Sequence, residues 1–185
     1  TRDYNFSLNN MVGFDLHGKT VGIVGTGKIG RVFADICRGF GMHILAYDKY
    51  PVEMKGVTYT SMETLLRESD IISLHCPLFP ETQNLINKDT IAMMKDGVVI
   101  LNYARGGLVN NDAVKAGLAS GKIRKYVVDF PDADTIGCDG IIAIPHLGAS
   151  TEESEDNCAK MAVKQLMNYI ENGNIINCII KFTFI

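Results

Sequence analysis

The sequence predicts an α/β fold: a doubly wound, mainly parallel sheet of seven strands with helices on both faces. Short apolar runs alternate with helical patterns along nearly the whole chain, and several runs are continuously apolar, as strands buried on both faces are. A glycine-rich turn also joins the first apolar run to the first helical pattern. Ligands of such sheets bind beyond the carboxyl ends of the strands, so residues that follow strand ends are the functional candidates.

The glycine-rich turn has the spacing of a dinucleotide-binding fingerprint. The apolar run 21–24 is followed by glycines spaced GxGxxG, namely Gly25, Gly27 and Gly30. The first permits a tight turn, the second lets the backbone approach a pyrophosphate, and the third lets the helix pack on the strand. The N-terminus of that helix offers free N–H groups to phosphates. The pattern therefore predicts a Rossmann sheet that binds a dinucleotide.

A carboxylate after the second apolar run predicts which dinucleotide is bound. The run 43–47 leads into Asp48, eighteen residues after Gly30 and close to the usual offset of about 20. A carboxylate there accepts hydrogen bonds from both ribose hydroxyls of NAD and repels the 2′-phosphate of NADP. We therefore expect NAD as the cofactor. The alternative is a glycine-rich turn with a surface aspartate.

The middle of the chain predicts three further strands and two helices. A short strand over 57–59 precedes a helix over 61–68, to which we assign a capping box of Thr60 and Glu63. A strand over 71–75 comes next, before a loop forced by two prolines. A helix capped by an asparagine then leads to a continuously apolar strand, typical of a parallel central position; these are Asn87 and 98–101.

The last third predicts two helices and two strands. Asn111 or Asp112 opens a helix, and strands over 126–129 and 141–144 follow it. We expect Ser150 to cap the last helix together with a glutamate three residues later, Glu153. That helix carries one apolar stripe, formed by Ala159, Ala162, Val163, Leu166 and Ile170.

Composition limits the partners that we expect. The 185 residues are 46% hydrophobic and 21% charged, with a formal charge of −3 and no basic stripe, which argues against nucleic acid and anionic membranes. No apolar run approaches the ~18 residues of a membrane span and no signal-peptide pattern opens the chain, so we expect a cytoplasmic protein. The five cysteines lack metal-type pairing, which predicts reduced thiols and no metal site.

We interpret residues 1–185 as a single domain. Residues 1–17 mix aromatic side chains with asparagines and form an expected N-terminal arm that docks rather than joining the sheet. Because the chain begins at Thr1 without an initiator Met and residues 174–185 form a strand-like run with no partner in the sequence, we expect it to be a fragment.

Polar residues follow the expected strand ends: Asp48, His75, Asn102–Arg105, Asp129 and His146. Arg105 lies on a glycine-rich turn, where its planar fork could hold a carboxylate and polarise a neighbouring carbonyl. His146 could move a proton near neutral pH. Beside a nicotinamide, the two side chains suffice to reduce a 2-keto acid. The alternatives are that Arg105 forms a surface ion pair and that His146 is an ordinary loop residue. We assign no function to His17 or His43. His75 is an intermediate case, because it ends a strand beside the expected cofactor site.

Four motifs together resemble the D-isomer-specific 2-hydroxyacid dehydrogenases: HGKTVGIVGTGKIG at 17–30, SLHCPL at 73–78, NYARGG at 102–107 and PHLGAS at 145–150. The resemblance covers nearly the whole chain but only that family's nucleotide-binding lobe. It implies that residues 174–185 lead toward an absent substrate lobe, that the partner is a small 2-hydroxy or 2-keto acid, and that the protein is a homodimer. By this resemblance the cofactor contacts are Gly25, Gly27, Lys28, Ile29, Gly30, Asp48, Cys76, Tyr103, Ala104, Arg105, Asp129, His146, Gly148 and Ala149.

The resemblance also implies a catalytic set. Arg105 and His146 match the family's substrate-binding arginine and acid–base histidine. Asp134 stands where the family usually has glutamate, in a segment that is shorter than usual, and Asp132 is a competing candidate.

Different parts of the chain resemble different branches of the family. Residues 5–8, 13–19 and 71–77 look most like D-lactate dehydrogenases. From residue 95 onward, and strongly over 144–172, the chain is similar to D-3-phosphoglycerate dehydrogenase, an enzyme of serine biosynthesis. We interpret the chain as the NAD-binding domain of an enzyme of the phosphoglycerate branch. The alternatives are a D-lactate dehydrogenase, a non-catalytic NAD sensor, or a nucleotide-binding module without turnover.

Overall fold

The computed structural model describes residues 13–176. The chain divides into two compact units, Thr1–Pro145 and His146–Ile185, which we describe separately. The expected arm falls mostly on residues 1–12 and the C-terminal strand-like run mostly on 177–185, and both of these ranges lie outside the described residues. The interpretation of the chain as a single domain stays a prediction.

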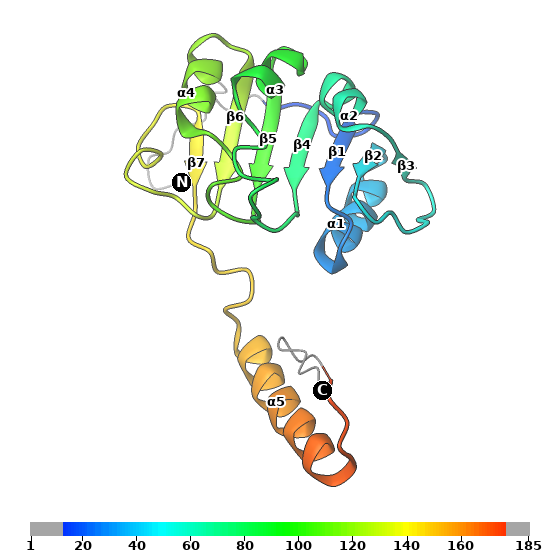
Figure 1. Ribbon diagram of the computed structural model, residues 1–185. Helices are drawn as coiled ribbons and strands as arrows, with labels where there is room; N and C mark the ends of the chain where they lie inside the picture. The colour runs from blue at the N-terminus through cyan, green and yellow to red at the C-terminus, as the bar shows by residue number, and fades with distance from the viewer. Residues whose placement is uncertain (1–12, 177–185) are drawn as a thin grey trace, which may run out of the picture. The chain divides into compact units, whose positions relative to one another are not determined.

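The first unit contains the predicted sheet. Seven strands lie in the order β3-β2-β1-β4-β5-β6-β7 within the described residues, and every neighbouring pair is parallel (Figure 1). The strands are β1 Thr20–Val24, β2 His43–Tyr47, β3 Thr58–Tyr59, β4 Ile71–Leu74, β5 Val98–Asn102, β6 Ile123–Val128 and β7 Ile141–Ala143. The chain builds outward from β1 to β3 and then returns to β4, so the topological switch point lies between β1 and β4.

Helices cover both faces of this sheet, as the sequence predicts. They are α1 Lys28–Gly39, α2 Met62–Glu68, α3 Lys88–Met93 and α4 Asn111–Ala119. α1 packs on one face through Ala34 and Cys37, and α2 to α4 pack on the other, where Leu65 and Leu66 are fully buried (Figure 1). Two apolar cores, one on each face, hold the carboxyl ends of the strands in fixed positions.

The helix caps confirm some sequence predictions and correct others. Asn87 caps α3 in a reciprocal capping box with Thr90, and Asn110 caps α4, which begins at Asn111. The cap of α2 is Ser61 rather than Thr60, because the Ser61 hydroxyl accepts the N–H of the third helical residue. Adjacent hydroxyl residues make the sequence pattern ambiguous by one position, and only the backbone geometry selects one of them.

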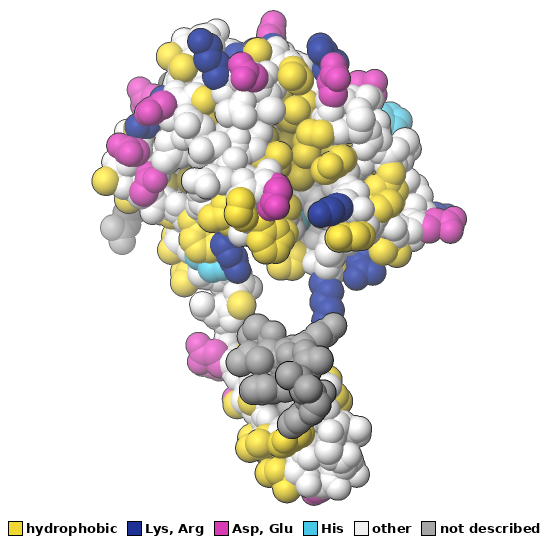
Figure 2. All heavy atoms as spheres, viewed as in Figure 1, with side chains coloured by type: hydrophobic (Ala, Val, Ile, Leu, Met, Phe, Trp, Pro, Cys, Tyr) yellow, Lys and Arg dark blue, Asp and Glu magenta, His cyan; other side chains and the backbone are white. Residues whose placement is uncertain are grey.

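The second unit is built on α5, Glu152–Asn172. Thr151 caps it, one residue after the expected Ser150, and Gly173 ends it in the left-handed conformation with φ 68°. All 21 residues of α5 are described, and none of them is buried. The predicted apolar stripe is therefore exposed, with Val163, Leu166 and Ile170 each more than half accessible, as the apolar surface along this helix in Figure 2 shows. Within residues 13–176, no helix has the length and apolar character needed to span a membrane.

Candidate dinucleotide-binding site

The glycine-rich turn lies at the switch point of the sheet. Gly25 directly follows β1 and donates its N–H to the Tyr47 carbonyl at 2.9 Å, while His75, directly after β4, donates to the Val24 carbonyl at 2.8 Å. These two hydrogen bonds fix the turn between its neighbouring strands. The turn is therefore held at the edge of the sheet where a parallel α/β fold binds its ligand.

The three fingerprint glycines have different local surroundings. Gly25 has φ +96°, a conformation that other residues rarely adopt, and a Cβ there would lie 2.8 Å from the His75 carbonyl carbon. A Cβ on Gly30 would overlap the carbonyl oxygen of Gly25, so the helix can pack this closely only with glycine. A Cβ on Gly27 would meet nothing within 4 Å. The space beside Gly27 is thus open to a ligand, as the pyrophosphate role requires.

The N-terminus of α1 faces that open space with its first-turn N–H groups. Its N-cap, Gly27, carries no capping side chain, and the first turn contains no acidic residue. Lys28 and Ile29, the first two helical residues, are exposed, the latter by 74%. Uncapped N–H groups with a positive partial charge suit a diphosphate. This end of α1 fits the pyrophosphate of NAD.

Asp48 follows β2 and is tied to the turn by hydrogen bonds. Its Oδ2 accepts the backbone N–H of Thr26 at 2.6 Å and the Thr26 hydroxyl at 2.9 Å, and its Oδ1 accepts the N–H of Tyr50 at 2.8 Å. Partial burial raises the pKa of this carboxyl, but the three hydrogen bonds outweigh burial and hold the pKa below its usual value. The carboxylate is ionised at neutral pH and lies at the expected ribose position.

Two residues of this site escaped the sequence analysis. Thr26, between two fingerprint glycines, is only 4% exposed, and Tyr59, on the edge strand β3, places its hydroxyl 3.1 Å from the Thr26 hydroxyl. The position of Thr26 inside GxGxxG was an available signal. Tyr59 is 33 residues away and gave none, because only the tertiary fold brings β3 to the turn.

His75 lies directly against the glycine-rich turn. Its Nε2 lies 2.9 Å from the Ser73 hydroxyl oxygen, and its ring contacts that of Phe33 with centroids 5.0 Å apart. Burial lowers the pKa of His75 to about 4, so its ring is neutral at pH 7. Cys76 beside it is partly buried; burial first, and then the charge of Asp48, raises the pKa of its thiol. Both side chains are therefore uncharged at neutral pH.

Asn102 organises the turn that carries Arg105. The asparagine is 1% exposed; its Nδ2 donates to the Arg105 carbonyl at 3.0 Å and to the Tyr126 hydroxyl at 3.3 Å, while its Oδ1 accepts the Ala104 N–H at 3.2 Å. The guanidinium of Arg105 is exposed and lies 5.7 Å from the centre of the Phe130 ring. An arginine on a braced turn, with its fork accessible, can bind a carboxylate. Asn102 stands at a predicted strand end, but the sequence pattern indicated no role for its side chain.

The two candidate carboxylates after β6 have different environments. Asp132 accepts hydrogen bonds from Asn111 at 2.8 Å and from the Thr135 hydroxyl at 2.9 Å, which closes a local turn. Asp134 has a side chain that is 75% exposed, with Oδ1 3.7 Å from the Lys115 ammonium. Desolvation raises the pKa of Asp132, but its hydrogen bonds together lower it by more. The turn thus engages Asp132 and leaves Asp134 accessible.

The remaining site candidates lie on both sides of the unit boundary. Tyr103 and Asp129 belong to the first unit, where burial and then the charge of Asp129 raise the pKa of Tyr103. His146, Gly148 and Ala149 belong to the second unit. The expected pairing of His146 with Arg105 and Asp134 therefore stays a prediction.

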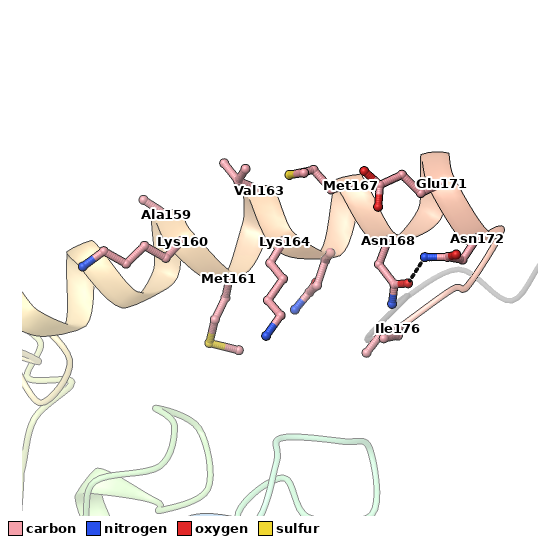
Figure 3. A pocket seen from close by; sticks show the side chains of 11 residues that line it. Ala159, Lys160, Met161, Val163, Lys164, Met167, Asn168, Glu171, Asn172 and Ile176 are labelled. Carbon is pink, nitrogen blue, oxygen red and sulfur yellow. Dashed lines mark hydrogen bonds between the residues drawn. The ribbon is translucent and has the colours of Figure 1, made fainter.

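A separate groove of about 970 Å³ runs along α5 in the second unit. Ala159, Val163 and Met167 lie in one row along it, and Lys160 and Lys164 extend below that row (Figure 3). Five of its eleven lining residues are apolar, ten of the eleven belong to α5, and none belongs to a glycine-rich turn. We assign no cofactor to this groove.

Comparison with known proteins adds a family to this geometry. Residues 1–148 match the family model described as D-isomer specific 2-hydroxyacid dehydrogenase, NAD binding domain. The chain is 47% identical over 133 residues to D-lactate dehydrogenase of Escherichia coli K12, which covers 70% of this chain and 40% of that protein. It is 37% identical over 178 residues to D-3-phosphoglycerate dehydrogenase of Bacillus subtilis 168, which covers 91% of this chain and 34% of that protein.

A solved structure shows the same likeness. The apo-structure of D-lactate dehydrogenase from Escherichia coli matches with a TM-score of 0.85 and 38% identity, over 96% of this chain and 59% of that one. The chain thus spans less than two thirds of the length of each of these relatives.

Proposed function

The chain belongs to the D-isomer-specific 2-hydroxyacid dehydrogenases and contains their NAD-binding domain; from this we propose that the whole protein transfers a hydride between NAD(H) and a D-2-hydroxy acid or its 2-keto acid. The observation that carries the proposal is the position of Asp48, which is hydrogen-bonded to the fingerprint turn beside the uncapped N-terminus of α1. One carboxylate for the ribose and one helix end for the diphosphate are what a bound NAD needs.

The cofactor contacts follow from this placement. Lys28 and Ile29 would contact the pyrophosphate at the start of α1, where Gly27 leaves open space, and Asp48 would bind the adenosine ribose. The other contacts proposed from the family resemblance are Cys76, Tyr103, Ala104, Arg105, Asp129, His146, Gly148 and Ala149. When bound, NADH supplies the hydride.

The chain's own residues would bind the substrate and move the proton. Arg105 would hold the carboxylate of the 2-keto acid and polarise its carbonyl, on a turn that Asn102 braces. His146 would donate a proton to the carbonyl oxygen. Asp134 would orient that histidine, and the local bonds of Asp132 support this choice over its neighbour.

Two substrates are supported by different relatives. The match to D-3-phosphoglycerate dehydrogenase extends over 91% of the chain, and we propose this branch first. The curated D-lactate dehydrogenase sequence matches over a shorter part of the chain, 70%, but with the higher identity, 47%, and the solved D-lactate dehydrogenase structure matches over 96% of the chain. These matches support D-lactate as the second candidate. Both candidates share the carboxylate next to the reacting carbon that Arg105 would bind.

The test is to replace the NAD-binding domain of each of these two relatives with this chain. We expect NADH oxidation in at least one hybrid, with hydroxypyruvate phosphate or with pyruvate, and its loss when Arg105 is replaced by Gln. If both folded hybrids bind NADH and neither turns over, the non-catalytic NAD-binding alternative is correct instead.

We also propose that the protein is a homodimer that associates through this domain. A row of apolar side chains on α1 and its C-cap residue, at intervals of three and four residues, points to solvent: Ile29 74%, Val32 59%, Ile36 53% and Phe40 54% exposed. We call these four residues the α1 row. Such a row on one helix face supports association with another protein surface.

A further inference from the structure

Most hydrogen-bond acceptor positions of the Asp48 carboxylate are already occupied by donors of the protein. Among residues 13–176, three donors reach it: the N–H and the hydroxyl of Thr26 on Oδ2, and the N–H of Tyr50 on Oδ1. An ionised carboxylate has about four acceptor positions. One position therefore remains, on Oδ1, whereas the adenosine ribose of NAD presents two hydroxyl donors.

The Tyr59 hydroxyl offers the Thr26 proton a second acceptor. Its oxygen lies 3.1 Å from the Thr26 hydroxyl oxygen and 2.8 Å from the Val52 carbonyl oxygen. The same oxygen accepts the Val52 N–H at 3.4 Å, which leaves one of its two lone pairs for a second donor. A carbonyl only accepts, and a tyrosine has a single proton to donate. When Tyr59 donates to Val52, its oxygen can accept the proton of Thr26. When it donates to Thr26, the threonine proton goes to Asp48.

The same heavy-atom positions therefore support two arrangements of hydrogen bonds. In one, Asp48 receives the threonine hydroxyl and has one position left. In the other, the threonine hydroxyl turns to Tyr59, and Asp48 has one position left on each oxygen. The second arrangement matches a ribose with two hydroxyls.

We propose that Tyr59 is a positioning residue for NAD binding, which takes the hydroxyl proton of Thr26 so that Asp48 can accept both ribose hydroxyls. The change is a rotation of two O–H groups; no covalent bond breaks and no net charge moves. The inference rests on the proposed function, because it requires NAD at this site. It adds two residues to the ribose site, one from the fingerprint turn and one from the edge strand.

Two substitutions separate this role from general support of the fold. Tyr59→Phe keeps the ring and removes the acceptor, so the threonine hydroxyl must compete with the ribose for Asp48. Losing one hydrogen bond to a charged group corresponds to roughly tenfold weaker NADH binding. Thr26→Val removes the competing hydroxyl while keeping the shape, so Tyr59→Phe should have no further effect in that background.

The ligand can be changed as well. An NADH analogue that lacks the 2′-hydroxyl of the adenosine ribose needs only one acceptor position, and Asp48 has one in either arrangement. Tyr59→Phe should therefore alter the affinity for the 2′-deoxy analogue by less than about twofold, against roughly tenfold for NADH. A merely structural role of Tyr59 would weaken both ligands equally.

The experiment is a fluorescence titration of the full 185-residue chain and its Tyr59→Phe, Thr26→Val and double variants with NADH and with the 2′-deoxy analogue. Selective loss of NADH affinity in Tyr59→Phe, absent in the Thr26→Val background, supports the proposal. Equal loss for both ligands, no loss, or a loss that persists beside Thr26→Val overturns it while leaving the proposed function intact. If the unaltered chain binds no NADH, the proposed function fails and this inference fails with it.

Discussion

The side-chain amide of Asn102 donates to the carbonyl of Arg105 at 3.0 Å, from a position at the end of β5 that is only 1% exposed. This contact ties the turn that carries the proposed substrate-binding arginine to the core of the sheet. The same amide reaches the buried hydroxyl of Tyr126, so the turn, β5 and β6 share one polar contact point.

Replacing Asn102 with Ala should therefore lower the stability of the folded protein. It leaves the Ala104 N–H and the Arg105 carbonyl without their partner, and we expect the free energy of unfolding to fall by about 2 kcal/mol in urea denaturation. The control is Asn111→Ala, whose side chain bonds to the exposed Asp132. A loss in the control as large as that in Asn102→Ala would show that the buried contact has no special weight.

Replacing Gly27 with Ala should abolish tight NADH binding without destabilising the fold. Gly27 has φ −63°, which alanine adopts freely, and the added Cβ meets no protein atom within 4 Å. The methyl group would instead occupy the open space assigned to the pyrophosphate, and we expect affinity to fall at least tenfold by titration. Gly39→Ala, also on open space at the far end of α1, is the matched control. Unchanged NADH affinity in Gly27→Ala would place the diphosphate elsewhere.

Stability should decrease as the pH falls from about 6.5 to about 4, because of His75. Its pKa in the folded protein is about 4, against 6.5 for the ordinary side chain, so in this window the unfolded chain binds a proton that the folded one does not. The stability that neutral His75 contributes is complete above pH 6.5. By pH 4 the free energy of unfolding should fall by up to about 3 kcal/mol. Urea denaturation across this range should show a shallower slope for His75→Gln and the original slope for His43→Gln. An identical slope in all three proteins would contradict a neutral, partly buried His75.

The α1 row predicts a dimer that one charge can dissociate. Ile36→Glu places a carboxylate in the middle of the row, and burying it against a partner would be costly. Sedimentation velocity should show a dimer for the unaltered chain and a monomer for this variant, with Lys88→Glu on α3 as a control that remains dimeric. A monomeric unaltered chain at all tested concentrations would exclude association through this row.

Local patterns in the sequence predicted the fold well. Seven apolar runs, the glycine spacing and the carboxylate after β2 are short-range features, and the structure confirms the sheet that they indicate. The exact caps of α2 and α5 were wrong by one residue, because neighbouring hydroxyl side chains look alike until the backbone is placed. The apolar periodicity of α1 also could not separate its buried Ala34 and Cys37 from the exposed Val32 and Ile36.

The polar network of the site was less accessible from sequence. The bonds from Tyr59 to Thr26 and from Asn102 to Tyr126 join residues 33 and 24 positions apart. Each depends on strand order and register, which place β3 beside β2 and β6 beside β5. Single-strand patterns carry no information about such pairings.

Calorimetric titration of the unaltered chain with NADH and with NADPH is the direct test of Asp48 as the ribose-binding carboxylate. The ionised carboxylate of Asp48, fixed by Thr26 and Tyr50, should accept the ribose hydroxyls of NADH and repel the 2′-phosphate of NADPH. We predict saturable NADH binding at least tenfold tighter than NADPH binding, with most of that difference lost in Asp48→Ala. Equal affinity for the two dinucleotides, or a preference that survives Asp48→Ala, would contradict the assignment of this turn and its carboxylate as the NAD site.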